Sequence, residues 1–112
     1  MAVTTTPKTL AFVQLANSKA DITAAPGATK KHHVHNILLH NANSAAEIVE
    51  LLHSDGTNEY HLFNRSMVVA ETVFLEYPGE GLVIEAAGKL TGNAETASKV
   101  TCWVNGSERV DA

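Results

Sequence analysis

The sequence predicts an all-β fold: a single-domain antiparallel β-sandwich, jelly-roll-like, with about eight strands. Two observations lead to this prediction. Short segments rich in β-branched and aliphatic residues recur along the 112 residues, and turn-forming residues separate them about every 8–12 positions. No segment shows a convincing long helical period. The length suffices for one domain with a modest core and is too short for two.

The densest apolar run covers residues 30–43, KKHHVHNILLHNAN. Its apolar residues change parity, because Val34 lies at an even position whereas Ile37 and Leu39 lie at odd ones. Either both faces of this strand are covered, or a bulge near residues 35–36 shifts the phase. The run predicts a central strand around which the domain is built.

The other predicted strands cover residues 10–15, 20–24, 46–53, 58–64, 67–70, 72–77, 82–86 and 99–105. Glycines at positions 88 and 92 predict a break after residue 86. For residues 46–53 a helix is the rival, since Ser44 and Glu47 have the spacing of a capping box. The turn at Asp55 and Gly56 favours a hairpin instead.

The predicted domain covers residues 10–106. Residues 1–9 are Thr-rich, contain Pro7 and are predicted to form a flexible, extended N-terminal arm. Asn105 and Gly106 predict a turn into a polar C-terminal tail at residues 107–112. Thr4 and Pro7 are candidate contact residues, because such an arm can clasp a neighbouring subunit.

Composition excludes several classes of partner. The formal net charge of −4, with scattered lysines and arginines, carries no electrostatic footprint for nucleic acid. No apolar run approaches the roughly 20 residues that span a membrane, and the N-terminus lacks the pattern of a signal peptide. We therefore expect synthesis in the cytoplasm. The single cysteine, Cys102, excludes an internal disulfide, and a small domain without such a link favours a homo-oligomer.

His33 and His35 form an H-x-H pair that could offer two imidazoles to one metal, and Gly27 gives the opening of a cupin first motif. The expected third ligand is missing from its place, where His40 stands. The favoured interpretation places these histidines on a solvent or subunit face. No nucleophile elbow occurs, and Cys102 lies inside an apolar strand, so we expect neither an enzyme nor a cofactor.

Three aromatic residues are candidate contacts with other proteins. Trp103 alternates with Val100, Cys102 and Val104, so it points outward if those residues form the core. An outward tryptophan is a plausible anchor of a subunit contact, and a strand buried on both faces is the alternative. Phe74 and Tyr60 carry the same two interpretations.

Four short motifs lie in the predicted turns and strand ends: Pro-Gly-Ala at 26–28, His-Asn at 40–41, Ala-Glu-Thr at 70–72 and Ala-Gly-Lys-Leu at 87–90. With these motifs, roughly residues 20–105 resemble small β-sandwich virion proteins of tailed bacteriophages. Lys89 stands where these proteins usually carry an acidic residue. None of these motifs contains a catalytic residue.

The resemblance implies a structural protein of the virion, either a capsid decoration (cement) protein or a neck or tail component. As a decoration protein it would bind the major capsid protein, with a homotrimer favoured. Two alternatives remain open. One is a sugar-binding β-sandwich module, against which the aromatic content of 5% counts. The other is a cupin-like metal-binding protein that uses His33 and His35.

Overall fold

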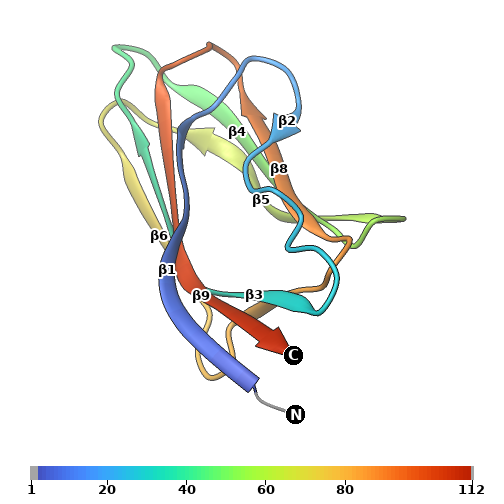
Figure 1. Cartoon of the computed structure of the whole chain (residues 1–112). Helices are drawn as coiled ribbons and strands as arrows, with labels where there is room; N and C mark the ends of the chain where they lie inside the picture. The colour runs from blue at the N-terminus through green and yellow to red at the C-terminus, as the bar shows by residue number, and fades with distance from the viewer. Residues whose placement is uncertain (1–2, 112) are drawn as a thin grey trace.

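The computed structural model describes residues 3–111 and shows two antiparallel β-sheets packed face to face (Figure 1). The first, sheet A, has the strand order β1-β9-β3-β6, with β7 also paired to β3; the second, sheet B, has the order β2-β8-β4-β5. The strands are β1 (Val3–Gln14), β2 (Ala20–Asp21), β3 (Lys30–Asn41), β4 (Glu47–Ser54), β5 (Glu59–Met67), β6 (Thr72–Glu76), β7 (Leu82–Ile84), β8 (Lys89–Ala94) and β9 (Val100–Asp111). The all-β sandwich prediction is confirmed.

The pairing has the topology of a jelly roll. With the short β7 set aside, the first strand pairs with the last, β2 with β8, β3 with β6, and β4 with β5. Such a chain is one long hairpin of paired strands, rolled up so that β9 also meets β3 and β8 also meets β4. Jelly rolls occur in viral capsid domains, lectins and cupins, so this topology alone selects no single function.

A bend divides sheet A, and it is built from two bulges and a glycine. Register shifts occur between Thr9 and Ala11 on β1 and between Val34 and Asn36 on β3, both beside Gly106 of β9. A Cβ at Gly106 would lie 1.9 Å from the carbonyl oxygen of His33, so only glycine fits here. The bulge proposed for the central strand is confirmed. β1, β9 and β3 curve together at the bend (Figure 1).

The ends of the chain differ from the prediction. Residues 3–9 form the first half of β1 and pair with β9, from Val3 opposite Asp111 to Thr9 opposite Asn105. The expected arm is therefore extended, as predicted, but is an edge strand rather than a free segment. Likewise residues 107–111 continue β9 instead of forming a tail. Neither result could be read from composition, because residues 3–9 find their backbone partners at the other end of the chain, and residues 107–111 pair with both β1 and β3. Residues 1, 2 and 112 lie outside the described residues.

The strand predicted at residues 46–53 is confirmed as β4, against the rival helix. Two other inner elements differ from the prediction. Residues 68–71 form a turn in place of the end of a predicted strand, with Glu71 N–H bonded to the Val68 carbonyl at 3.1 Å. β8 was missed, because Gly92 was interpreted as a break. In the fold, a Cβ there would lie 2.4 Å from the Glu50 carbonyl oxygen, so close pairing with β4 requires the glycine.

The core lies between the sheets and is aliphatic. Its fully buried side chains alternate along the central strands: Val34, Ile37, Leu39, Val49, Leu51, Met67, Ile84, Val100, Cys102 and Val104. Burial raises the pKa of the Cys102 thiol to about 12, as expected for an inert buried thiol. No helix within residues 3–111 is long and apolar enough to cross a membrane.

Candidate interaction surface

Four large side chains form one row across the outer face of sheet A, the face turned away from sheet B. The register places Phe12 opposite Trp103, Trp103 opposite Leu38, and Leu38 opposite Phe74. Directly opposed residues of neighbouring strands point to the same side of a sheet. Phe12, Phe74 and Trp103 are 64%, 52% and 39% exposed, and Leu38 is half-buried. We call Phe12, Trp103, Leu38 and Phe74 the aromatic row.

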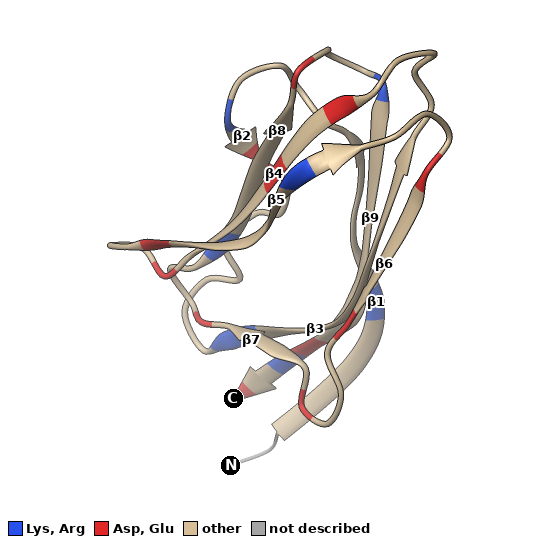
Figure 2. Ribbon diagram, turned by 180° about the vertical axis from the view of Figure 1, so that it is seen from behind, with Lys and Arg blue, Asp and Glu red and all other residues tan. Residues whose placement is uncertain are grey.

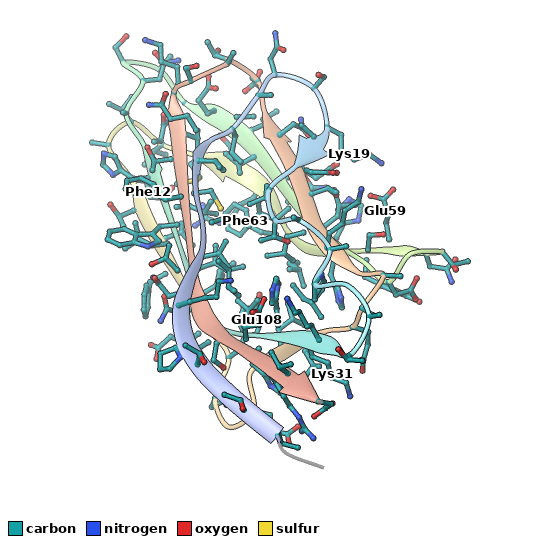
Figure 3. The ribbon with its side chains drawn as sticks, viewed as in Figure 1. Phe12, Lys19, Lys31, Glu59, Phe63 and Glu108 are labelled. Carbon is teal, nitrogen blue, oxygen red and sulfur yellow. The ribbon has the colours of Figure 1, made fainter. Side chains whose placement is uncertain are left out.

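The two largest members of the row stack on each other. The ring centroids of Phe12 and Trp103 are 5.0 Å apart and the planes differ by 3°. Neighbouring strands are about 4.8 Å apart, so rings stacked at this distance stand upright on the sheet and present their edges to solvent. Figure 3 shows Phe12 on the side of β1 away from sheet B, whereas Phe63 points between the sheets. A sugar stacks on an exposed ring face, and this arrangement covers one face of each ring.

Uncharged polar residues flank the aromatic row on both sides. Thr9, Asn105 and Asn36 lie opposite one another on one side, and Asn105 donates from Nδ2 to Asn36 Oδ1 at 3.0 Å. On the other side Gln14, Thr101, His40 and Thr72 lie opposite one another, and His40 Nδ1 and Thr72 Oγ1 are 2.8 Å apart. Within these three rows, Glu76, paired with Asn36, is the one residue with a formal charge at pH 7. An apolar centre with a polar, weakly charged surround is the anatomy of a protein–protein interface.

The outer face of sheet B has the opposite chemistry. Lys19 Nζ lies 2.6 Å from Glu59 Oε1, and Thr91 Oγ1 donates to Glu59 Oε2 at 3.2 Å. The hydrogen bond from Lys19 lowers the pKa of Glu59 below its ordinary value. Lys89 pairs with Asp21 at 3.0 Å beside them. Lys19 and Glu59 extend outward from this sheet (Figure 3), and the ribbon carries charged positions on β2, β4 and β5 (Figure 2).

These charged residues line an open depression of about 300 Å³. Its lining residues are Lys19, Ala20, Asp21, Ser54, Gly56, Thr57, Glu59, Lys89 and Thr91. Because both lysines already pair with carboxylates of the same surface, the depression offers no unpaired charge of either sign to a ligand. We therefore place the candidate contact surface on sheet A.

The structure brings together only part of the predicted contact set. Trp103 points outward, as the parity of β9 predicted, and Phe74 lies in the same row. Tyr60 is 53% exposed but belongs to β5 in sheet B. Thr4 and Pro7 lie on β1, beyond the bend. Phe12 and Leu38 were missed, because only the register of the sheet reveals that four distant strand positions meet.

The histidines of β3 do not form a metal centre with other donors. Within residues 3–111, no three His, Cys, Asp or Glu side chains come together in a way that could hold a metal ion. His33 Nδ1 lies 2.9 Å from the Glu80 carbonyl oxygen, and His35 is exposed at the bulge. The bulge interrupts the regular alternation of β3 at His35, which has no paired residue in β9.

A different histidine of this strand is buried, which no local pattern predicts. His32 is 7% exposed, and its Nε2 lies 3.1 Å from Glu108 Oε2 on β9. This hydrogen bond is the main cause of the lowered pKa of Glu108, with a contribution from Lys8, 3.4 Å away. The Nδ1 atom of His32 meets no hydrogen-bond partner among residues 3–111. The pair joins β3 to β9 below the bend.

A buried carboxylate holds the loops at the other end of the sandwich. Glu47 is 2% exposed and accepts hydrogen bonds from Thr96 N–H at 2.7 Å, Thr96 Oγ1 at 2.9 Å and Asn43 Nδ2 at 3.1 Å. Burial alone would raise the pKa of Glu47, but these hydrogen bonds outweigh it and lower the pKa. Glu47 is thus a structural anion that ties two loops to β4.

No protein-family model and no curated protein matches this chain. Among solved structures, the chain is similar to a pentameric capsid protein isolated from metagenomic phage sequences, with 19% sequence identity over 91% of this chain and 61% of that one, at a TM-score of 0.39. It is also similar to a chain of the infectious bursal disease virus Gx strain, with 11% identity over 96% of this chain and 31% of that one, at a TM-score of 0.45. It thus spans about three fifths of the phage protein and under a third of the virus chain.

Proposed function

We propose that this chain is a structural protein of a tailed-phage virion, namely a capsid decoration protein that binds the outer head surface and stabilises the joints between capsomers. The observation that carries the proposal is the aromatic row, an exposed and uncharged contact surface on a rigid sheet. The turn and strand-end motifs that resemble phage virion proteins support the assignment to a phage particle.

The chemistry of the surfaces favours this role over the two other uses of a jelly roll. A cupin needs several metal-binding side chains at one point, and within residues 3–111 no such group of three exists. A sugar-binding module presents open ring faces, whereas Phe12 and Trp103 each have one ring face covered by the other. Contacts between proteins are enriched in aromatic side chains that the partner removes from water, and the exposed aromatic row supplies such side chains.

The physical task of such a protein is to bury surface across joints that the packaged genome pushes apart. Its partners are the major capsid protein and further copies of itself, and no cofactor, nucleic acid or membrane takes part. The net charge of −4 suits a position outside the shell, away from the genome. We propose a binding role without catalysis, in a virion assembled from chains made in the host cytoplasm.

The test is the copy number of this chain in purified particles, measured by quantitative mass spectrometry against the major shell protein. A ratio of the same order as the shell protein supports decoration of the head. A few copies per particle would replace it with a neck or tail position. Absence from the particle would overturn the virion role altogether.

A further inference from the structure

We infer that the outer face of sheet A binds a second copy of this chain, packed face to face about a twofold axis. The inference deepens the proposed function, because it names the partner of the same surface. It rests on that function only in treating the aromatic row as a protein contact.

The edges of the sheets are poorly suited to pairing two copies, since the edge strands β6 and β2 are short and the longer ones, β1 and β5, carry features that oppose pairing. β1 is an edge strand with Pro7, which lacks an N–H, next to Lys8, and with a bulge at the bend. β5, an edge of sheet B, carries a register shift and the charged residues Glu59 and Arg65. Proline, charges and bulges are the features that keep edge strands from adding to another sheet. A second copy is therefore expected on a face.

The distribution of charge favours the outer face of sheet A over that of sheet B as the contact between two copies. Each copy has a net charge of −4, so two copies meet most easily where few charges are desolvated. The outer face of sheet B would have to bury Lys19, Glu59, Asp21 and Lys89. The aromatic row and its two flanking rows contain one formal charge at pH 7, that of Glu76.

A twofold axis pairs this face with itself without opposing like charges. Let the axis run parallel to the strands and pass between Trp103 and Leu38. Phe12 then lies over Phe74 of the second copy, and Trp103 over its Leu38. In the flanking row, Glu76 meets Thr9 of the second copy rather than another Glu76. Each contact occurs twice, which is the property of an isologous interface.

The size of the face sets the strength of the contact. Four strands at about 4.8 Å spacing and three rows of side chains cover about 400 Å² per copy. The total, about 800 Å², is below the roughly 1,200 Å² of standard stable interfaces. We therefore expect a weak dimer in solution. Many copies held close together on a particle would strengthen this contact.

Trp103 is a natural fluorescent probe of the contact, because it is the one tryptophan of the chain and lies at the centre of the contact. The experiment is sedimentation equilibrium of the full chain from about 1 μM to about 1 mM, the range expected for a small interface. Tryptophan emission and acrylamide quenching are recorded on the same samples. We expect a monomer–dimer equilibrium, with emission shifting to shorter wavelength and quenching falling as the dimer fills.

Matched charge substitutions identify the face. Phe74→Lys, which brings a lysine into the contact, should weaken dimerisation at least tenfold. Ile48→Lys changes a residue of similar exposure, 51% against 52%, on the outer face of sheet B and should leave it unchanged. Circular dichroism and thermal unfolding confirm that both variants fold.

Several results would overturn the inference: a monomer throughout the concentration range, a trimer in place of a dimer, equal effects of the two lysine substitutions, or association without any change in Trp103 emission. The wild-type fluorescence series decides the question even if Phe74→Lys does not fold. The copy number in particles tests the virion role separately. Failure of the dimer and failure of the virion role are therefore distinguishable.

Discussion

The two outer faces of this sandwich contrast in chemistry although the same fold supports both. On sheet A, the aromatic row crosses four strands with polar, mostly uncharged neighbours. On sheet B, Lys19, Glu59, Lys89 and Asp21 form two ion pairs over Thr91. An average composition of 18% charged residues conceals this segregation. A charged face remains hydrated, whereas exposed aromatic edges gain free energy when a partner removes them from water.

The largest expected effect comes from removing the bend that bounds the aromatic face. In Gly106→Ala, the new Cβ would lie 1.9 Å from the His33 carbonyl oxygen, so β3 and β9 must separate locally. We expect a loss of about 4 kcal/mol or more, enough to prevent stable folding of a small domain. Urea unfolding followed by circular dichroism measures it.

Gly79→Ala is the control for this substitution. No atom lies within 4 Å of a Cβ built there, although its φ of +68° disfavours other residues. It should cost only about 1–2 kcal/mol. Equal losses in the two variants would show that backbone conformation, and not the crowded bend, determines the effect.

A second pair of substitutions separates the inner and outer sides of one strand. Val104 is fully buried and Trp103 is 39% exposed, although they are neighbours in β9. Val104→Ala should lower the free energy of unfolding by about 2–3 kcal/mol, from lost burial and a cavity. Trp103→Ala should cost the monomer less, despite the larger side chain. The reverse order in dilute solution would place Trp103 in the core.

Substitution of Glu47 tests the hydrogen bonds that tie two loops to β4. Glu47→Gln replaces a carboxylate that accepts three hydrogen bonds, so we expect a loss of about 2 kcal/mol at pH 7. The folded-state pKa is lowered from 4.5, so this contribution is complete above the unfolded-state pKa and is lost as the pH falls through the folded-state pKa. Denaturant titrations should show the two proteins converging in acid. A constant difference would contradict the role of the charge.

The smallest effect is expected on the charged face. Lys19→Met removes an exposed ion pair with Glu59, and such pairs contribute little to stability. The unfolding temperature should fall slightly at low salt and match the wild type at high salt, because salt screens surface charges. Self-association through sheet A should respond far less to salt. Thermal scans and sedimentation across a salt series measure both.

Much of the fold could be predicted from local patterns. The turn at Asp55 and Gly56 identified the β4–β5 hairpin, and the phase change in β3 indicated its bulge. β8 and the ends of β1 and β9 could not be predicted. Gly92 is required by close contact with a strand about 40 residues away, and Val3 finds its partner Asp111 at the opposite end of the chain.

The contact surface was predicted only in part for the same reason. The alternation of β9 placed Trp103 outward, but no local pattern aligns it with Phe12, Leu38 and Phe74. That alignment depends on the register of three pairings, two of which contain a bulge. The burial of His32 was also unpredictable from local patterns. It depends on β9 and β7, which pair with β3 on either side, and not on the residues next to His32 in the sequence.

The most direct test of the central claim, that the aromatic face of sheet A is a protein contact, is hydroxyl-radical footprinting with mass spectrometry. The dilute chain is compared with the concentrated chain and with particles that contain it. We predict protection of Phe12, Trp103 and Phe74 in at least one of the assembled states, while Tyr60 on sheet B, 53% exposed, stays reactive. Unchanged reactivity of the aromatic row in both assembled states would contradict the claim.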